Sequence, residues 1–396
     1  MTKRAQALAL AFALSLHIGC VPPHTTPPQG EAERRALTTR LVNEFALPRL
    51  ASLQSNAGAL VDATLRFEAT GGVDGADRTD AREALMALQA TWQQLEILQL
   101  GPAGAPTVFA GGQGLRDGIN SWPLVSPCSA DQQIVQNRLT EPDFIAGRLV
   151  NTIGLHTLEY LLFRDDTDNA CPAAASINAN GTWQAIGPTE ITARRSVFAR
   201  VLAHDIKVRV DALASAWTTG FGDELKSAGA GSTLFSSAQQ ALDEVYAALF
   251  FLELKTKDRK LAVPAGLHID CADDVCPTLT ESPYARQSLV HITENLRGAR
   301  LVFLGENDDG IDGPGFDDLL RSAGHDDAAT TITAAADVAV AAAEGFEGTI
   351  EDVLVTEPER VRALHATVKV FTDELKGTLP SLLGLRVPDE GAGDND

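Results

Sequence analysis

The sequence lacks the motifs that identify the commonest hydrolases. It contains no His-Glu-x-x-His pair for a zinc protease helix, no Cys-x-x-Cys for a cysteine metal site and no Gly-x-Ser-x-Gly elbow for a serine hydrolase. These absences disfavour the usual catalytic classes and favour a binding role.

Positive charge is also scarce. The 396 residues include 32 Lys and Arg against 53 Asp and Glu, which gives a formal net charge of −21. Such acidity argues against nucleic-acid backbones and anionic membrane surfaces as partners. It is compatible with cationic partners, including metal ions, and equally with acidity that only keeps the protein soluble.

Long apolar runs are absent beyond the N-terminus, so no later segment approaches the ~20 residues needed to span a bilayer. The N-terminus has a basic "MTKR" and then an apolar run ending at Gly19 and Cys20, which resembles a bacterial lipoprotein signal, although His17 stands where leucine is usual. We expect a signal peptide over residues 1–20 and a lipid on Cys20. Ordinary cleavage and release into the periplasm is the alternative. The predicted location is the periplasmic side of the cell envelope, with a lipid anchor in the outer membrane.

Only five cysteines are present. With Cys20 assigned to the lipid, four remain, an even number that suits disulfides in an oxidising compartment. Cys271 and Cys276 lie in a short loop-like stretch and could close a small ring, whereas Cys128 and Cys171 lie in two irregular segments. The four cysteines allow three pairings.

Strand signals are few, and helical periodicity dominates. "GTWQAIG" could form a hairpin edge, but little else alternates. The periodicity predicts long helices near residues 31–67 (broken or kinked near Pro48), 78–100, 142–164, 190–220, 234–259, 281–305, 324–347 and 355–383. Eight helices in two sets of four predict an all-α fold of two antiparallel four-helix bundles packed side by side.

The expected domain order follows from this pattern. After the signal peptide we predict a proline-rich tether over residues 21–33, a first bundle over 34–230 and a second bundle over 231–385. The acidic end, residues 386–396, is expected to be disordered.

The stretch "GLHTLEYLLF" places a histidine and a glutamate inside an apolar segment. Ile145, Leu149 and Ile153 precede His156 at helical spacing, which predicts one inward-facing stripe. Glu159 lies one turn further along the same face. An unpaired carboxylate there would cost several kcal/mol of desolvation. A cation, an arginine, hydrogen bonds or a water-filled cleft must therefore satisfy it.

The spacing of this pair is not specific by itself. A second His-x-x-acid pair exists at His291 and Glu294. From the residues alone, the first pair could be functional, a buried hydrogen-bonded pair or an exposed pair. Its apolar surroundings favour the first reading, and so does Gly154, which would let a backbone or a ligand approach closely.

In this context Gly-x-His-x-x-Glu, at residues 154–159, resembles the hallmark of the imelysin family of bacterial exported proteins. Other stretches resemble the family in the same order: "TWQQLEILQLGP" (91–102), "INSWPL" (119–124), "LELKTKDRKLAVPAG" (252–266) and "ESPYARQSLVHITENLRG" (281–298). The resemblance implies two four-helix bundles with a cleft site around the motif. It also implies a link to iron uptake, in a family first described as peptidases.

A histidine and a glutamate at positions i and i+3 resemble carboxylate-bridged metal sites in helical bundles, and these donors suit iron, zinc or manganese. His156 and Glu159 are the first two predicted ligands, and further ligands must come from other helices. Glu96 is the first candidate and Glu253 the second. Glu96 could instead cap a helix or pair with an arginine, and Glu253 could be a solvated helix residue.

Four further residues are expected to line the cleft: Gly154, Trp92, Trp122 and Ser282. Each has a structural alternative. The two tryptophans could be packing residues, and Ser282 could cap the helix that follows it.

We therefore predict a cell-envelope protein that binds a metal ion (iron favoured, zinc second) or a metal-bearing small ligand. Its expected role is acquisition or sensing with an envelope uptake system, without nucleic acid and with no membrane contact beyond the lipid anchor. A metallopeptidase is the first alternative: His156 and Glu159 could be two of three zinc ligands, but no obvious base then remains. A non-metal cleft for a peptide or partner protein is the second. His291 and Glu294 would suit a metal site or such a cleft equally, and we interpret their spacing as coincidence.

Overall fold

The computed structural model describes residues 30–106 and 112–388. The predicted signal peptide, Cys20, most of the tether and the acidic end beyond residue 388 lie outside the described residues. Within those two ranges the regular structure is helical and no strand occurs, which confirms the all-α prediction. In the same ranges, no helix combines the length and the apolar character that a bilayer crossing requires.

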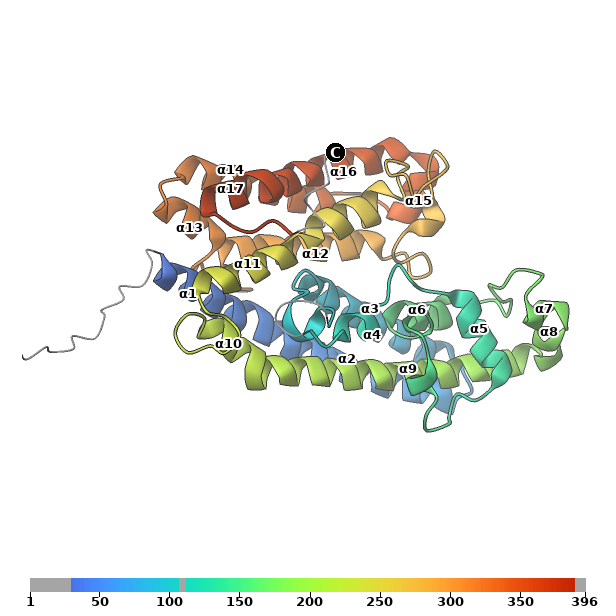
Figure 1. The fold of residues 1–396 in the computed structure, drawn as a ribbon. Helices are drawn as coiled ribbons and strands as arrows, with labels where there is room; N and C mark the ends of the chain where they lie inside the picture. Colours follow the sequence, from blue (N-terminus) through green and yellow to red (C-terminus); the bar gives the residue numbers. More distant parts are fainter. Residues whose placement is uncertain (1–29, 107–111, 389–396) are drawn as a thin grey trace, which may run out of the picture.

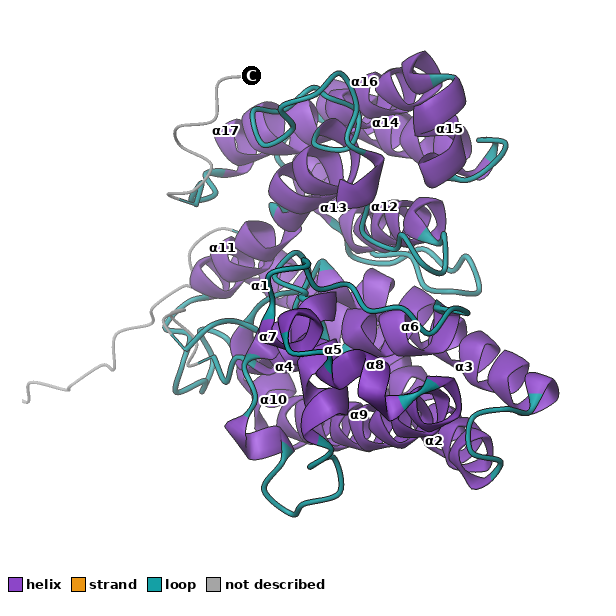
Figure 2. Cartoon of the chain, turned by 90° about the vertical axis from the view of Figure 1, so that its right-hand side faces the viewer, coloured by secondary structure: helices purple, strands orange, loops and turns teal. Residues whose placement is uncertain are grey.

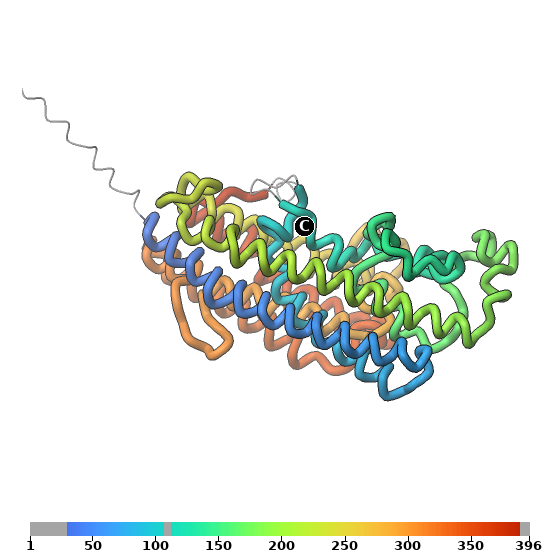
Figure 3. The backbone as a smooth tube through the Cα atoms, turned by 90° about the horizontal axis from the view of Figure 1, so that it is seen from below, coloured from blue at the N-terminus to red at the C-terminus, as the bar shows by residue number. Residues whose placement is uncertain are grey.

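The first half of the chain forms one layer of helices (Figure 1). Its α-helices are α1 (Glu31–Arg40), α2 (Leu47–Ala69), α3 (Gly75–Glu96), α4 (Leu115–Ile119), α5 (Pro127–Gln136), α6 (Leu155–Phe163), α7 (Ser176–Ala179), α8 (Thr182–Ile186), α9 (Pro188–Ala216) and α10 (Gly222–Lys226). The tighter or wider turns are η1 (Leu41–Ala46), η2 (Gly101–Ala103), η3 (Ile145–Gly147), η4 (Val150–Thr152) and η5 (Trp217–Phe221). Helix α2 packs against α3 and α9, and α6 contacts both α3 and α9. Figure 3 shows α2 and α9 side by side in opposite directions.

The second half forms the other layer. It consists of α11 (Ala238–Leu249), the π-helix η6 (Leu252–Ala262), η7 (Pro277–Leu279), α12 (Ser288–Leu304), α13 (Phe316–Ser322), α14 (Asp326–Glu344), α15 (Ile350–Thr356), α16 (Pro358–Asp373), η8 (Glu374–Thr378) and α17 (Leu379–Leu383). Helix α14 packs between α12 and α16, and α16 packs on η6. Figure 2 shows α12–α17 above α2, α6 and α9.

The packing of α12 on α3 joins the two layers. A second junction lies near α1, whose Glu31 carboxylate accepts a hydrogen bond from the backbone N–H of Ala238 at 2.7 Å. Helix α1 precedes the expected domain boundary near residue 230, and it contacts α11, which follows that boundary. The finer division into two bundles of four, 34–230 and 231–385, stays a prediction.

The prediction of one helix over residues 142–164 is wrong in its first part. The chain there makes the short turns η3 and η4, and α6 begins only at Leu155. Gly154 has a φ of +84°, which an α-helix does not allow, so no helix continues through it. The predicted stripe before His156 is therefore absent, and Leu149 is 74% exposed.

Other predicted elements also differ in detail. "GTWQAIG" is not a hairpin edge, because α8 forms there and buries Trp183. Residues 281–287 form a turn, so the predicted helix over 281–305 begins seven residues late. The predicted break near Pro48 is a π-helical turn just before it, and Pro48 itself fits the first turn of α2, where its missing N–H is not needed.

The structure forms two disulfides, one of the three pairings that the sequence allows. Cys128 pairs with Cys171, with Cα atoms 4.5 Å apart, and joins α5 to the segment after α6. Cys271 pairs with Cys276, with Cα atoms 5.8 Å apart, and closes a small ring in the loop after η6.

Candidate functional site

Gly154 fixes the start of α6, the helix that carries the His-Glu pair. A Cβ atom added to it would lie 2.8 Å from the carbonyl oxygen of Ile119. Its φ of +84° is also unfavourable for any residue with a side chain. Gly154 therefore lets the beginning of α6 pack against the segment that leads to Trp122. It does so from outside the cleft, because it is not among the residues that line the cavity.

We expect Gly154→Ala to lower the free energy of unfolding by about 1–3 kcal/mol, because it combines a strained backbone with a backbone clash. Denaturant unfolding of the purified protein measures this loss. Gly58→Ala is the matched control: Gly58 lies within α2, and its added Cβ would meet nothing within 4 Å. That variant should be neutral or more stable by up to ~1 kcal/mol. Equal stability of the two variants would contradict the role given to Gly154.

His156 lies at the centre of a buried polar cluster, with its side chain 5% exposed. Its Nδ1 atom is 3.6 Å from Oε2 of Glu159, and its Nε2 atom is 3.6 Å from Oε1 of Glu281. Neither ring nitrogen has a hydrogen-bond partner among the described residues. Burial opposes protonation, but the two carboxylates outweigh it and raise the pKa of His156 to about 9. The imidazole is therefore cationic near neutral pH.

The Glu159 carboxylate is already fully engaged. It accepts hydrogen bonds from Ser282 Oγ at 2.8 Å, from Gln89 Nε2 at 3.1 Å and from the backbone N–H groups of Tyr284 and Ala285, each at 3.1 Å. Burial works against its charged form, yet His156 and these donors hold the pKa of Glu159 below its usual value. Hydrogen bonds, one of the partners that the sequence allowed, are present, and Glu159 also lines a cavity. Glu159 thereby anchors the 281–287 turn to α6.

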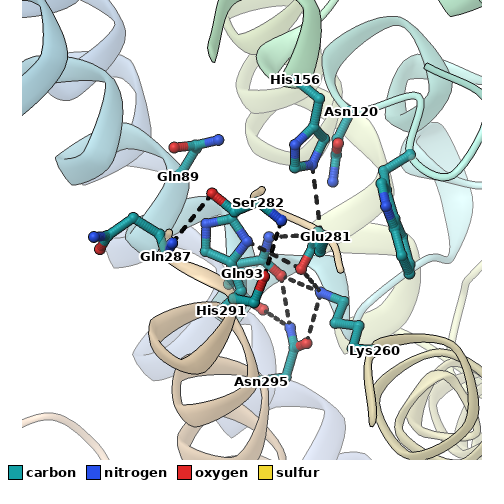
Figure 4. Close-up of polar contacts among 12 residues, drawn as sticks. Gln89, Gln93, Asn120, His156, Lys260, Glu281, Ser282, Gln287, His291 and Asn295 are labelled. Carbon is teal, nitrogen blue, oxygen red and sulfur yellow. Dashed lines mark hydrogen bonds and ion pairs between the residues drawn. The ribbon is translucent and has the colours of Figure 1, made fainter. Parts of the chain in front are cut away.

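Glu281, which the sequence did not single out, is a further carboxylate that links the two layers. Its Oε2 atom lies 2.8 Å from Lys260 Nζ and 3.0 Å from His291 Nδ1, and its Oε1 atom accepts a hydrogen bond from Gln93 Nε2 at 3.2 Å (Figure 4). Although burial opposes ionisation, the charges of Lys260 and His291 hold the pKa of Glu281 well below its usual value. Glu281 is therefore an anion between two cationic groups, His156 and Lys260.

A cavity of about 360 Å³ opens beside this cluster. Its polar end is formed by His156, Glu159 and Glu281. Its wall is mostly apolar or aromatic and contains Trp122, Pro123, Val125, Pro127, Val263, Leu279, Pro283 and Tyr284. Arg259 and Asp270, which form an ion pair, also line it. Both layers contribute, so this is a cleft between them with room for a small molecule.

Residues 46–375 match the family model described as Imelysin. The chain belongs to the imelysin family. None of the curated proteins compared matches it.

Two solved structures share the imelysin-type fold of this chain. One, from Parabacteroides distasonis ATCC 8503, is described as an iron-regulated protein A precursor; it has a TM-score of 0.69 and 17% identity, over 91% of this chain and 97% of that one. The other is an imelysin-like protein from Psychrobacter arcticum 273-4, with a TM-score of 0.63 and 19% identity, over 90% of this chain and 98% of that one. At such identities the likeness concerns the fold.

The predicted ligands of this imelysin-family protein are not gathered around one point. His156 and Glu159 lie together, and Glu96 lies in the adjoining network, where Arg116 Nη2 at 3.3 Å and Asn120 Nδ2 at 2.9 Å contact its Oε1 atom. The arginine pairing that the sequence left open for Glu96 is therefore present.

Glu253 is placed elsewhere. It is buried and ion-paired with Lys257 at 3.1 Å and Lys376 at 3.3 Å. Among the described residues, no group of three or more His, Cys, Asp or Glu side chains is arranged to hold a metal ion.

The structure places some of the predicted cleft residues at the site and others away from it. Trp122 lines the cavity, and Ser282 lies behind it as a donor to Glu159, so it is a polar contact of the site. Trp92 is buried at 1% exposure outside the cavity wall, as a packing residue would be.

His291 belongs to the cluster through Glu281, whereas its spacing from Glu294 has no part in it. Its ring centroid lies 6.1 Å from that of His156. Glu294, in contrast, pairs with Arg297 and accepts from Gln94, outside the contacts of His156. The sequence contained only a weak indication that His291 belongs to the site: it is a lone histidine on an otherwise apolar stretch of helix.

Proposed function

We propose that this imelysin-family protein is a non-catalytic binding protein of the cell envelope. It holds a metal ion, with iron favoured, or a metal-bearing ligand in the cleft beside His156 and Glu159. One observation carries the proposal: a buried histidine has two ring nitrogens without hydrogen-bond partners among the described residues and borders a cavity of about 360 Å³. An imidazole nitrogen is a good ligand for iron or zinc.

The surrounding carboxylates support cation binding at this position. Glu281 presents its Oε1 atom 3.6 Å from His156 Nε2, and both residues line the cavity. Metal binding requires the neutral imidazole, so it would release the proton that His156 holds near neutral pH. Each oxygen of Glu159 accepts two hydrogen bonds, whereas Oε1 of Glu281 accepts one, from Gln93. His156 and Glu281 are therefore the side chains that would hold the cargo. A metal that arrives with its own organic ligands needs only such a small number of protein donors, and the apolar wall would contact those ligands.

The relation to iron rests on the family and on one structural neighbour. That neighbour is described as iron-regulated. The predicted signal peptide would bring this chain to the envelope, where acquisition or sensing with an uptake system is the proposed role.

The test compares metal binding by the wild type and His156→Ala. Isothermal titration with ferrous iron under anaerobic conditions, with ferric citrate and with zinc gives the affinities, and elemental analysis gives the metal content of the purified protein. We expect His156→Ala to bind at least ~10-fold more weakly, because loss of even a partner that only orients a metal ligand typically costs 10- to 100-fold. His204→Ala, at an exposed position on α9, is the matched control and should bind as the wild type does. Equal affinity in all three proteins would reject the metal-binding proposal.

A protease assay on unfolded casein with the same proteins examines the metallopeptidase alternative. Cleavage that a chelator abolishes, and that His156→Ala lacks, would replace the binding role by a catalytic one. Absence of cleavage together with metal binding agrees with the proposal.

A further inference from the structure

Lys260 is a fully buried cation surrounded by oxygen atoms. Its Nζ atom lies 2.6 Å from Gln93 Oε1, 2.8 Å from Glu281 Oε2, 2.9 Å from Asn295 Oδ1 and 3.1 Å from Glu96 Oε2. The side chains of Lys260, Glu96 and Glu281 have no exposed surface. Figure 4 shows the ammonium group converging with Gln93, Glu281 and Asn295. We call these four oxygen donors (Gln93, Glu96, Glu281 and Asn295) the oxygen cage.

The oxygen cage is held in place by contacts other than those to Lys260. Asn295 Nδ2 donates to the backbone oxygen of Gln93 at 2.7 Å, and Gln93 Nε2 donates to Glu281 Oε1 at 3.2 Å, so both amide groups have their oxygens turned toward the lysine. Arg116 and Asn120 hold the other oxygen of Glu96. The four oxygens therefore come from α3, α12 and the 281–287 turn in an arrangement that does not depend on the ammonium group alone.

Two carboxylates and two amide oxygens are the donors that hard divalent cations such as Ca²⁺ and Mg²⁺ take in proteins. An ammonium group has only three N–H donors for the four oxygens around it. The rings of Trp122 and Phe251 lie over the same ammonium group, with centroids 6.0 and 5.6 Å from Nζ. Trp122 also lines the cavity, so the oxygen cage adjoins the inner end of the cleft.

We propose that Lys260 is a specificity-determining residue, whose tethered ammonium group fills the oxygen cage and excludes free hard divalent cations from the inner end of the cleft. The inference rests on the proposed function for its purpose: with the cage filled, the cleft selects cargo through the imidazole of His156 and the Oε1 atom of Glu281. Glu281 connects the two, because Oε2 contacts Lys260 while Oε1 faces His156.

The test removes the ammonium group of Lys260 and supplies free Ca²⁺ or Mg²⁺ in its place. Lys260→Ala removes the side chain that fills the oxygen cage and leaves room there for a free cation. We expect this variant to bind Ca²⁺ or Mg²⁺ at least ~10-fold more tightly than the wild type by isothermal titration. At 10 mM Ca²⁺ its Tm should rise by about 5 °C, since ligand binding to the folded state stabilises it. The wild type should show neither response. Tight Ca²⁺ or Mg²⁺ binding by the wild type would overturn the proposal.

Lys257→Ala is the matched control. Lys257 lies one turn away on η6, is equally buried, and is ion-paired with Glu253 and Asp258. A gain in Ca²⁺ affinity equal to that of Lys260→Ala would overturn the proposal, and so would no gain in Lys260→Ala. Adding Glu96→Gln to Lys260→Ala should abolish the gain, because it removes one charged oxygen donor.

Two further points keep the outcome decisive. If Lys260→Ala does not fold, Lys260→Ser, whose side chain is also short, takes its place in the same titrations. The result is also separable from the proposed function: loss of iron binding in His156→Ala tests the cargo site, whereas Ca²⁺ and Mg²⁺ binding by Lys260 variants does not require that iron binds at all.

Discussion

Glu281→Ala should lower the free energy of unfolding by about 3–5 kcal/mol, the range found when one partner of a buried ion pair is removed. Lys260 would lose its closest carboxylate while remaining fully buried, and His291 and Gln93 would lose the oxygen atoms they contact. The charge of Glu96 stays beside Lys260, so we expect the lower part of this range. Urea unfolding at pH 7, followed by circular dichroism, measures the loss.

Two comparisons separate this effect from a general loss of charge. Glu344→Ala removes an exposed carboxylate that pairs with Arg297 on α12, and such a surface pair is worth less than about 1 kcal/mol. The double variant Glu281→Ala/Lys260→Met removes both buried charges. Its loss should be smaller than the sum of the two single losses by about 1–3 kcal/mol, because the residues are in contact. A loss for Glu281→Ala no larger than that for Glu344→Ala would contradict the role given to the buried pair.

The burial of His156 and Glu159 could be predicted because their immediate neighbours are apolar. This local pattern holds even though the predicted start of the helix was wrong. The partners could not be predicted in the same way. Gln89 lies 70 residues before Glu159, and Tyr284 lies 125 residues after it. Pairing over such distances depends on how α3, α6 and the 281–287 turn meet, which no local pattern specifies.

Lys260 shows a second limit of sequence patterns. The stretch "LELKTKDRKLA" is rich in charge and would ordinarily be interpreted as a solvated helix face. It forms the π-helix η6, whose wider turn changes which side chains share a face, and it buries Lys257 and Lys260 completely. An analysis with the α-helical period of 3.6 residues cannot reveal this burial, because a π-helix has more residues per turn.

For Glu253, the sequence pointed to an unusual environment but to the wrong site. Its position after "ALFFL" correctly suggested an unusual environment, since the side chain is only 2% exposed. The sequence could not show that Lys376, 123 residues away, joins the nearby Lys257 as its partner, and that Glu253 does not lie at the histidine site. An apolar context thus predicts that a carboxylate needs a partner but does not predict which one.

Raising the pH should destabilise the protein through His156, by up to about 3 kcal/mol between pH 6.5 and pH 10. The pKa of His156 rises from 6.5 to about 9 in the folded state, and one pKa unit corresponds to about 1.4 kcal/mol. Burial acts in the opposite direction, so the increase reflects the charges of Glu159 and Glu281 beside the ring. Because the folded state binds this proton more tightly than the unfolded state, the stabilisation is complete below pH 6.5. It is lost as the pH rises through about 9.

At acidic pH, stability falls as the pH falls, and carboxylates rather than His156 cause the change. The pKa values of Glu159 and Glu281 are lowered in the folded state, so their stabilisation is present above about pH 4.5 and is lost as the pH falls through the lowered values. Urea unfolding from pH 4 to pH 10 should therefore show a maximum between about pH 5 and 6.5. His156→Gln should remove the decline on the alkaline side specifically, whereas His204→Gln, at an exposed position, should keep it. An alkaline slope that is the same in all three proteins would mean that the two carboxylates do not hold the proton on His156, and the cationic imidazole would have to be abandoned.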